Sequence, residues 1–228
     1  MTPRGAGGAL GALLAGALWL TSGAAAHEPA RMPAPDFVPP PPGTYTLERI
    51  MAAPDGEVLG LDGRPQRLGA FTHERITVLG FIYTTCVDPD GCPRAYQVFD
   101  AVHEAVAAAP ALRERVRLVT LSFDPARDTP SMMRRYAGSR ARPGPVPWLF
   151  LTTRSARELM PLLEGFGQDI RYTTDRSSGA PRRELAHVLK VFLIDRAGFV
   201  REIYSSEFLY RRTVLNDIET LMLEERAR

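Results

Sequence analysis

The sequence predicts an α/β domain with a mixed sheet flanked by helices. From residue 44 onward, strand-like apolar runs alternate with segments of helical periodicity. A strand–turn–strand pattern and one amphipathic helix close the chain. About 200 residues follow the N-terminal segments, which is enough for one domain with a sizeable core. Since no internal repeat or second boundary is visible, we expect a single domain over residues 44–228.

The first 26 residues have the pattern of an export signal. Arg4 precedes an apolar run over residues 9–20, and three alanines at 24–26 form a small-residue cleavage site. Residues 1–26 therefore predict either a cleaved signal peptide or an uncleaved N-terminal anchor. Both alternatives predict an exported domain in the periplasm, and only the uncleaved anchor would attach it to the membrane.

Residues 27–43 are rich in proline and end in the run 39–42. This composition predicts an extended linker that holds the domain away from the signal or the membrane. The net charge of +2 at pH 7 gives no case for binding nucleic acid or an anionic membrane surface.

Apolar runs and turn residues locate the strands. The Asp-Gly turns between residues 56 and 68 predict a hairpin, and the continuous apolar run 77–83 predicts a central strand buried on both faces. Further strands are expected at 116–123, 148–151, 188–194 and 199–204.

Helix signals lie between these strands. Pro93 suits the first turn of a helix that Pro110 ends, and Thr129 is expected to cap a short helix through Tyr136. Ser155 and Glu158 form a capping-box pattern for a helix to about Phe166. The last helix presents one apolar face made of Val214, Leu215, Ile218, Leu221 and Met222.

The two cysteines, Cys86 and Cys92, lie between the buried strand and the helix that follows it. A helix N-terminus favours the thiolate form. Residues 88–91, Asp-Pro-Asp-Gly, predict a type I turn that brings the sulfurs within disulfide or chelating distance. A structural disulfide, reversible dithiol exchange and capture of a soft metal such as Cu(I) all remain open. The carboxylates of Asp88 and Asp90 are expected to raise the pKa of the nearby thiols.

Four histidines are candidates for a third ligand, which would let a copper site accept Cu(II) as well. His187 is the best of them because it stands at the start of a predicted strand, after the polar stretch 171–183. His27, His73 and His103 are weaker candidates. A lone histidine at a strand end is more often a hydrogen-bonded surface residue, and spacing alone does not bring His187 to the cysteines.

Several motifs taken in order resemble the SCO/SenC family. They are Phe81-Ile-Tyr-Thr-Thr-Cys86, Cys92-Pro93, Leu121-Ser-Phe-Asp-Pro-Ala-Arg-Asp-Thr-Pro130, Trp148-Leu-Phe-Leu-Thr152, and His187 before Phe192-Leu-Ile-Asp195. The resemblance implies a thioredoxin-like fold and a copper site made by Cys86, Cys92 and His187, with Cys86–Cys92 as the disulfide of the oxidised form. It also implies copper delivery to the binuclear centre of cytochrome c oxidase, or thiol–disulfide reduction of that centre.

Two departures from the family pattern are present. The family's usual spacing has three residues between the cysteines, whereas five separate them here, and the acidic residue common before the histidine is replaced by Ala186. The nearest acid is Glu184. These differences suggest a divergent branch with a different copper or redox client.

The first functional hypothesis is a metallochaperone, not a turnover enzyme, whose partners are a respiratory copper enzyme, its assembly proteins and other copper or thiol carriers. The alternatives are a periplasmic thiol–disulfide oxidoreductase that uses Cys86 and Cys92 without a metal, and a scaffold with an inert disulfide. A peroxidase is less supported, since Arg94 is the one cation near Cys86 and is expected to face solvent. Asp124 and Asp128 are expected to have structural roles.

Overall fold

The computed structural model describes residues 35–86, 88, 91–175 and 182–227. All of these residues belong to one compact unit, Ala34–Arg228. The predicted signal at 1–26 and the first part of the predicted linker lie outside them. No helix in these described ranges is long and apolar enough to cross a membrane.

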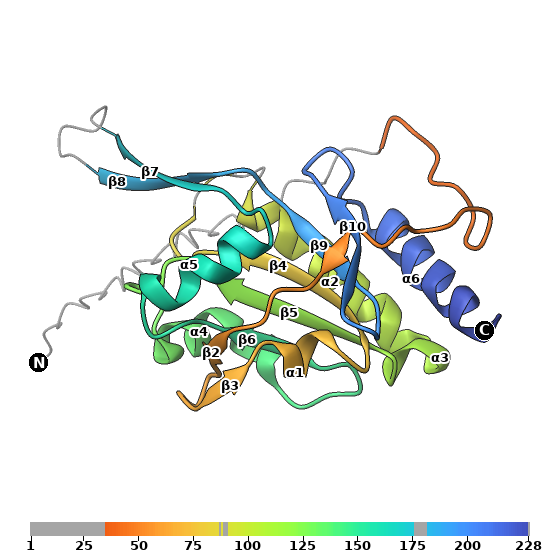
Figure 1. Cartoon of the computed structure of the whole chain (residues 1–228), viewed down its shortest axis with the longest axis horizontal. Helices are drawn as coiled ribbons and strands as arrows, with labels where there is room; N and C mark the ends of the chain where they lie inside the picture. Colours follow the sequence, from red (N-terminus) through yellow and green to blue (C-terminus); the bar gives the residue numbers. More distant parts are fainter. Residues whose placement is uncertain (1–34, 87, 89–90, 176–181, 228) are drawn as a thin grey trace, which may run out of the picture. The chain divides into compact units, whose positions relative to one another are not determined.

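A mixed sheet forms the centre of the domain (Figure 1), with strand order β1-β10-β9-β4-β5-β6. Strands β4, β5 and β6 are parallel, whereas β9 is antiparallel to β4 and β10 is antiparallel to β9. The predicted mixed sheet is therefore confirmed. The strands are β1 (Met51–Ala52), β4 (Ile76–Ile82), β5 (Val116–Ser122), β6 (Trp148–Leu151), β9 (Val191–Ile194) and β10 (Phe199–Tyr204).

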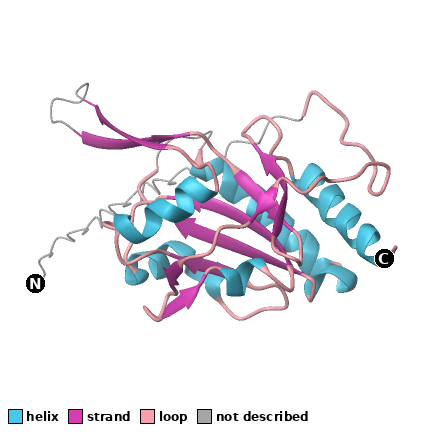
Figure 2. Ribbon diagram, in the orientation of Figure 1, coloured by secondary structure: helices cyan, strands magenta, loops and turns pink. Residues whose placement is uncertain are grey.

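Helices cover both faces of this sheet, as Figure 2 shows. On one face, α5 (Ala156–Gly165) packs its leucines against Leu79 and Phe81 of β4. On the other, α2 (Cys92–Ala108) approaches so closely that a Cβ on Gly80 would lie 2.9 Å from the ring of Phe99. The remaining helices are α1 (Gly69–Thr72), α3 (Pro110–Arg113), α4 (Pro130–Ala137), η1 (Gly138–Ala141) and α6 (Arg211–Arg226).

The local signals in the sequence are confirmed at most of these elements. All of β4 is buried, as expected for a central strand. Thr129 caps α4 by accepting a hydrogen bond from the N–H of Met132 at 3.4 Å. Ser155 caps α5 through the N–H of Glu158 at 3.3 Å. The predicted hairpin is formed by β2 (Glu57–Leu59) and β3 (Pro65–Arg67).

One prediction was wrong and one hairpin was missed around residues 170–194. The strand expected at 188–194 begins only at Val191. The polar stretch 171–183, for which no element was predicted, contributes to a hairpin made of β7 (Ile170–Asp175) and β8 (Arg182–His187). The charged residues obscured this pairing, because the apolar alternation of β7 is limited to Ile170 and Tyr172. β-formers at Tyr172, Thr173 and Thr174 were the available signal.

The described end of the predicted linker contacts the domain instead of standing clear of it. Asn216 of α6 donates a hydrogen bond to the carbonyl of Pro40 at 2.8 Å, and the N–H of Gly43 donates to Thr220 at 3.0 Å. Phe37 packs against Phe208 and Tyr210. A proline has a backbone carbonyl but no N–H group, and the carbonyl of Pro40 accepts its hydrogen bond from a side chain of α6.

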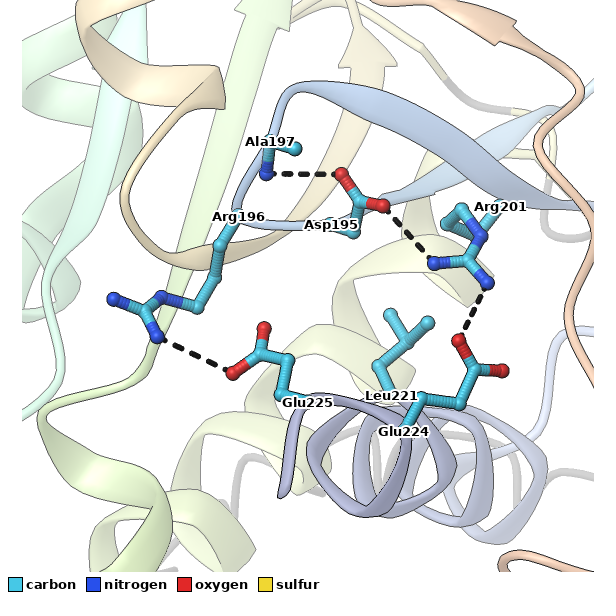
Figure 3. A pocket seen from close by; sticks show the side chains of 7 residues that line it. All are labelled: Asp195, Arg196, Ala197, Arg201, Leu221, Glu224 and Glu225. Carbon is cyan, nitrogen blue, oxygen red and sulfur yellow. Dashed lines mark hydrogen bonds and ion pairs between the residues drawn. The ribbon is translucent and has the colours of Figure 1, made fainter. Parts of the chain in front are cut away.

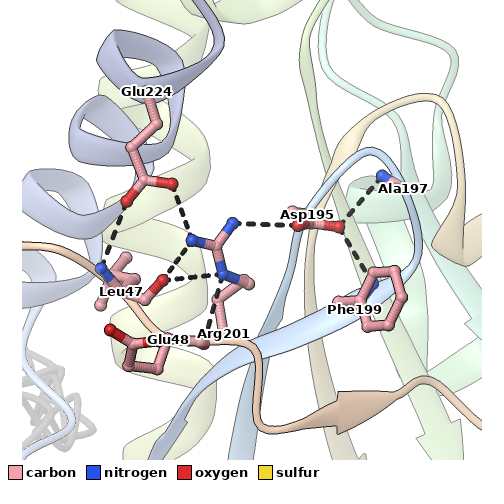
Figure 4. Close-up of polar contacts among 7 residues, drawn as sticks. All are labelled: Leu47, Glu48, Asp195, Ala197, Phe199, Arg201 and Glu224. Atoms are coloured by element: carbon pink, nitrogen blue, oxygen red, sulfur yellow. Dashed lines mark hydrogen bonds and ion pairs between the residues drawn. The ribbon is translucent and has the colours of Figure 1, made fainter. Parts of the chain in front are cut away.

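At the end of the sheet where β9 turns into β10, a buried ion-pair network ties the sheet to α6 (Figure 3). The guanidinium of Arg201 donates to Asp195 at 2.9 Å and to Glu224 at 2.7 Å. It also bonds the carbonyl of Leu47 (Figure 4). The network closes one side of a cavity of about 290 Å³.

Candidate functional site

The two cysteines lie where β4 leaves the sheet and α2 begins. The N–H of Cys86 bonds the carbonyl of Tyr83 at 3.1 Å, and the N–H of Gly91 bonds the carbonyl of Asp88 at 3.1 Å. The second bond joins the first and last residues of the predicted turn, whose other members, residues 89 and 90, lie outside the described residues. Both cysteines are free thiols, so the Cys86–Cys92 disulfide stays a prediction.

The two sulfurs interact directly, and their pKa values shift in opposite directions. The thiol of Cys92 donates a hydrogen bond to the sulfur of Cys86, which lowers the pKa of Cys86 to about 5. The same bond, together with burial, raises the pKa of Cys92 far above its usual range. Cys86 is half-buried and Cys92 is only 1% exposed. The pair therefore consists of a reachable thiolate and a buried thiol.

The backbone around the sulfurs also favours the thiolate. The N–H groups of Cys92 and Asp88 bond the sulfur of Cys86 and lower its pKa. The helix N-terminus thus acts on Cys86, as expected, but the thiol of Cys92 stays protonated. Asp88 lowers the pKa through its N–H, opposite in sign to the effect expected of its carboxylate.

Strand pairing brings His187 to this end of the sheet. Val191 of β9 pairs with Gly80 of β4, so the residues before β9 lie beside those that follow β4. The imidazole of His187 meets the rings of Tyr83 and Phe123 at centroid distances of 5.8 and 4.6 Å. Among the described residues, no hydrogen-bond partner reaches its buried Nε2 atom.

Tyr83 thus contacts both the thiol pair and His187. Within the described ranges, no three His, Cys, Asp or Glu side chains are arranged as a ready metal site. The other described histidines lie elsewhere: His103 bonds the carbonyl of Val146 at 3.0 Å, and His73 bonds that of Gly69 at 3.0 Å. His27 lies outside the described residues. The roles of Cys86, Cys92 and His187 as metal ligands stay predictions.

Asp128 holds the loop that carries Cys86. Its carboxylate, in a residue 1% exposed, accepts hydrogen bonds from the hydroxyl of Thr84 at 2.5 Å, the N–H of Thr84 at 3.1 Å and the hydroxyl of Ser122 at 2.5 Å. Burial raises the pKa of Asp128, while these donors oppose the rise. Asp128 therefore has a structural role, as expected, and that role is to hold the cysteine loop. Asp124 pairs with Arg127 at 3.0 Å.

Sequence reasoning gave no role to Tyr83, and it placed Arg94 in solvent. Arg94 is half-buried, and its guanidinium lies over the ring of Tyr210, 5.4 Å from the centroid. The position of Tyr83 directly after the buried strand was the available signal for its place in the site.

A mixed sheet flanked by helices, with a cysteine pair where a central strand meets a helix, defines a thioredoxin-like domain. The chain belongs to the SCO1/SenC family, whose sequence profile matches residues 62–223. No curated protein matches the chain significantly.

Solved structures share this fold. ScoI of Arabidopsis thaliana with copper bound has a TM-score of 0.63 at 17% identity, covering 76% of this chain and 99% of that one. Apo Sco1 of Thermus thermophilus has a TM-score of 0.56 at 25% identity, covering 81% and 95%. BsSco, a Sco family cytochrome c oxidase assembly protein with a disulfide switch, has a TM-score of 0.54 at 19% identity, covering 75% and 93%.

Proposed function

We propose that this protein is an exported copper-binding assembly factor that holds copper through Cys86, Cys92 and His187. Its cargo is delivered to a respiratory copper centre such as that of cytochrome c oxidase. The observation that carries the proposal is the thiol pair at the end of β4 together with His187. The imidazole of His187 packs against Tyr83, which bonds the sulfur of Cys86, and its Nε2 atom has no partner among the described residues.

The donor set suits copper in both oxidation states. Thiolate sulfur is the ligand that Cu(I) prefers, and an added imidazole gives a site that accepts Cu(II). Cys86 is a thiolate at neutral pH, because its pKa is lowered to about 5. Copper displaces the proton of Cys92, since thiol ligands bind metal in the deprotonated form. Family membership and the copper-bound Arabidopsis ScoI support the same choice of metal.

Copper binding by purified variants tests this proposal. We expect the reduced protein to bind one equivalent of Cu(I) against a chelator under anaerobic conditions, and Cys86→Ser and Cys92→Ser each to abolish that binding. His187→Ala should weaken Cu(II) binding strongly but leave a measurable affinity, because the two cysteine sulfurs remain. His73→Ala is the matched control, because His73 is exposed and bonds the carbonyl of Gly69. Equal copper binding by wild type, Cys86→Ser and His187→Ala contradicts the proposal.

The client is tested in cells. Deletion of the gene should lower the copper content and activity of cytochrome c oxidase. Wild type should restore both, whereas Cys86→Ser and His187→Ala should not. Full oxidase activity in the deletion strain excludes this client, and copper quantification of the other exported copper enzymes then identifies the centre that depends on the protein.

The unequal acidities of the sulfurs favour a second function, thiol–disulfide exchange. The thiolate of Cys86 attacks a disulfide of a partner, forming a mixed disulfide and releasing one partner thiolate. Cys92 then loses its proton and attacks the Cys86 sulfur, which releases the second partner thiolate and leaves the Cys86–Cys92 disulfide. The partner disulfide is reduced by the two electrons that the cysteine pair loses.

His187→Ala separates the two functions. Exchange with a glutathione redox buffer should keep the wild-type equilibrium in His187→Ala and be lost in Cys86→Ser. If His187→Ala restores the cellular phenotype as wild type does, exchange is the physiological function; if it fails, copper binding is.

A further inference from the structure

Tyr83 touches both cysteines through its main chain. Its carbonyl accepts a hydrogen bond from the N–H of Cys86 at 3.1 Å, and its N–H bonds the sulfur of Cys92. The hydroxyl of Tyr83 bonds the sulfur of Cys86. The residue follows the last residue of β4, so the buried strand fixes its main chain relative to the sulfurs.

The ring of Tyr83 reaches the third proposed ligand. It meets the imidazole of His187 edge to face, with an angle of 79° between the rings and 5.8 Å between the centroids. Phe123, which is fully buried, lies 5.3 Å from the ring of Tyr83 and 4.6 Å from that of His187. These three side chains form the Tyr83–Phe123–His187 ring cluster, in which Phe123 is the fixed support.

Aromatic contacts orient the imidazole without using its Nε2 atom. His103 shows the alternative, since its Nε2 bonds the carbonyl of Val146 at 3.0 Å and that bond would have to break before a metal could bind. At His187 the Nε2 atom is buried and makes no hydrogen bond with any of the described residues. Edge-to-face pairs prefer a defined geometry, so the ring cluster restricts the rotamers of His187.

We propose that Tyr83 is a positioning residue of this site, whose ring holds the imidazole of His187 beside the cysteine pair. The inference rests on the copper function proposed above. Tyr83 contacts both the sulfur of Cys86 and the imidazole of His187, so this residue connects the two parts of the proposed ligand set. Pre-positioning a ligand lowers the ordering cost of binding, which raises affinity without any new bond to the metal.

The metal-free protein gives the first test. We expect the ring proton resonances of His187 to carry ring-current shifts from Tyr83 and Phe123. Tyr83→Phe keeps the ring and should keep these shifts, whereas Tyr83→Leu should move them toward the values of an exposed histidine. Unchanged His187 resonances in Tyr83→Leu overturn the proposal before any copper is added.

Copper binding gives the second test. Tyr83→Leu should weaken Cu(II) binding roughly tenfold, which corresponds to about 1.4 kcal/mol, and should change the sulfur-to-copper charge-transfer spectrum toward that of His187→Ala. Tyr83→Phe keeps the ring that contacts His187 and loses only the hydroxyl bond to the Cys86 sulfur, so its effect on both properties should be clearly smaller than that of Tyr83→Leu. Tyr210→Leu is the matched control, because Tyr210 is another half-buried tyrosine of the domain that packs on Phe37 and under Arg94.

A double-mutant cycle shows whether Tyr83 acts through His187. In the His187→Ala background, Tyr83→Leu should change copper affinity by less than about twofold, since coupled residues give non-additive effects. A full tenfold loss in that background overturns the proposal, as does a Tyr83→Phe variant that behaves like Tyr83→Leu. Failure of the copper function itself is distinguishable, because His187→Ala then binds copper as wild type does.

Discussion

The two ends of the central sheet differ in how completely their buried polar groups are paired. Where β9 turns into β10, Arg201 is 5% exposed and bonds Asp195, Glu224 and a backbone carbonyl (Figure 4). Asp195 also accepts from the N–H groups of Ala197 and Phe199 at 3.0 Å each. At the cysteine end, the sulfurs bond one another and the Nε2 of His187 has no partner among the described residues.

This difference indicates that one end of the sheet serves stability and the other end serves binding. A buried charge whose partners are all present fixes one geometry, and the loss of one partner leaves the others desolvated. A binding site needs donors that the protein itself does not satisfy, because each internal bond must be broken before a ligand can take its place. We therefore expect substitutions at the Arg201 end to change stability, and substitutions at the cysteine end to change chemistry.

The largest effect is expected at Arg201. Arg201→Met should lower the free energy of unfolding by about 3–5 kcal/mol, because the buried Asp195 and the partly buried Glu224 lose their shared cation. Denaturant unfolding of the metal-free protein measures it. The copper affinity of the folded fraction should equal that of wild type. A loss of copper affinity with unchanged stability would contradict the assignment of this end of the sheet to stability.

Asp128→Ala should affect both properties, because Asp128 joins the cysteine loop to the core. The variant leaves the N–H and hydroxyl of Thr84 and the hydroxyl of Ser122 without their acceptor. We expect a loss of about 1–3 kcal/mol in the free energy of unfolding, together with a shifted reduction potential of the cysteine pair. Asp124→Ala, which removes a bond to the half-exposed Arg127, is the control and should leave the potential unchanged.

Cys92→Ala tests the acidity of Cys86. A thiolate with a pKa of about 5 reacts at a constant rate with iodoacetamide from neutral pH down to about pH 6, and the rate falls as the pH drops through 5. Without the thiol donor of Cys92, the pKa rises and the fall begins at higher pH. At pH 6 we expect alkylation at least roughly tenfold slower than in wild type. An unchanged pH profile contradicts the assigned hydrogen bond.

The smallest effect is expected at an exposed ion pair. Arg154 bonds Glu57 at 2.9 Å and Glu158 at 3.1 Å, and its side chain is 58% exposed. Arg154→Met should change the free energy of unfolding by less than about 1 kcal/mol, because solvent and salt screen such pairs. Copper binding should not change. A loss comparable to that of Arg201→Met would show that burial is not what distinguishes the two networks.

Most helices and strands of the domain were predictable because their signals are local. Thr129 and Ser155 cap the helices that follow them, and the apolar run before Tyr83 forms the buried central strand. The hairpin that ends at His187 was not predicted, because most of its residues are polar and its apolar pattern is too short to reveal the pairing. The contacts of the described end of the predicted linker were not predicted for a related reason: they are with α6, at the far end of the sequence.

The sequence by itself determined the cysteine pair, since Cys86 and Cys92 are joined by one short turn at a strand–helix junction. The resemblance carried by its motifs pointed to His187 as their partner. Only the tertiary structure decided how these residues meet, because the pairing of Val191 with Gly80 brings the segment after β8 beside the end of β4. It also decided that Tyr83 contacts both the Cys86 sulfur and the imidazole, and that the thiolate belongs to Cys86. Such proximity depends on sheet register between distant segments, which no local pattern encodes.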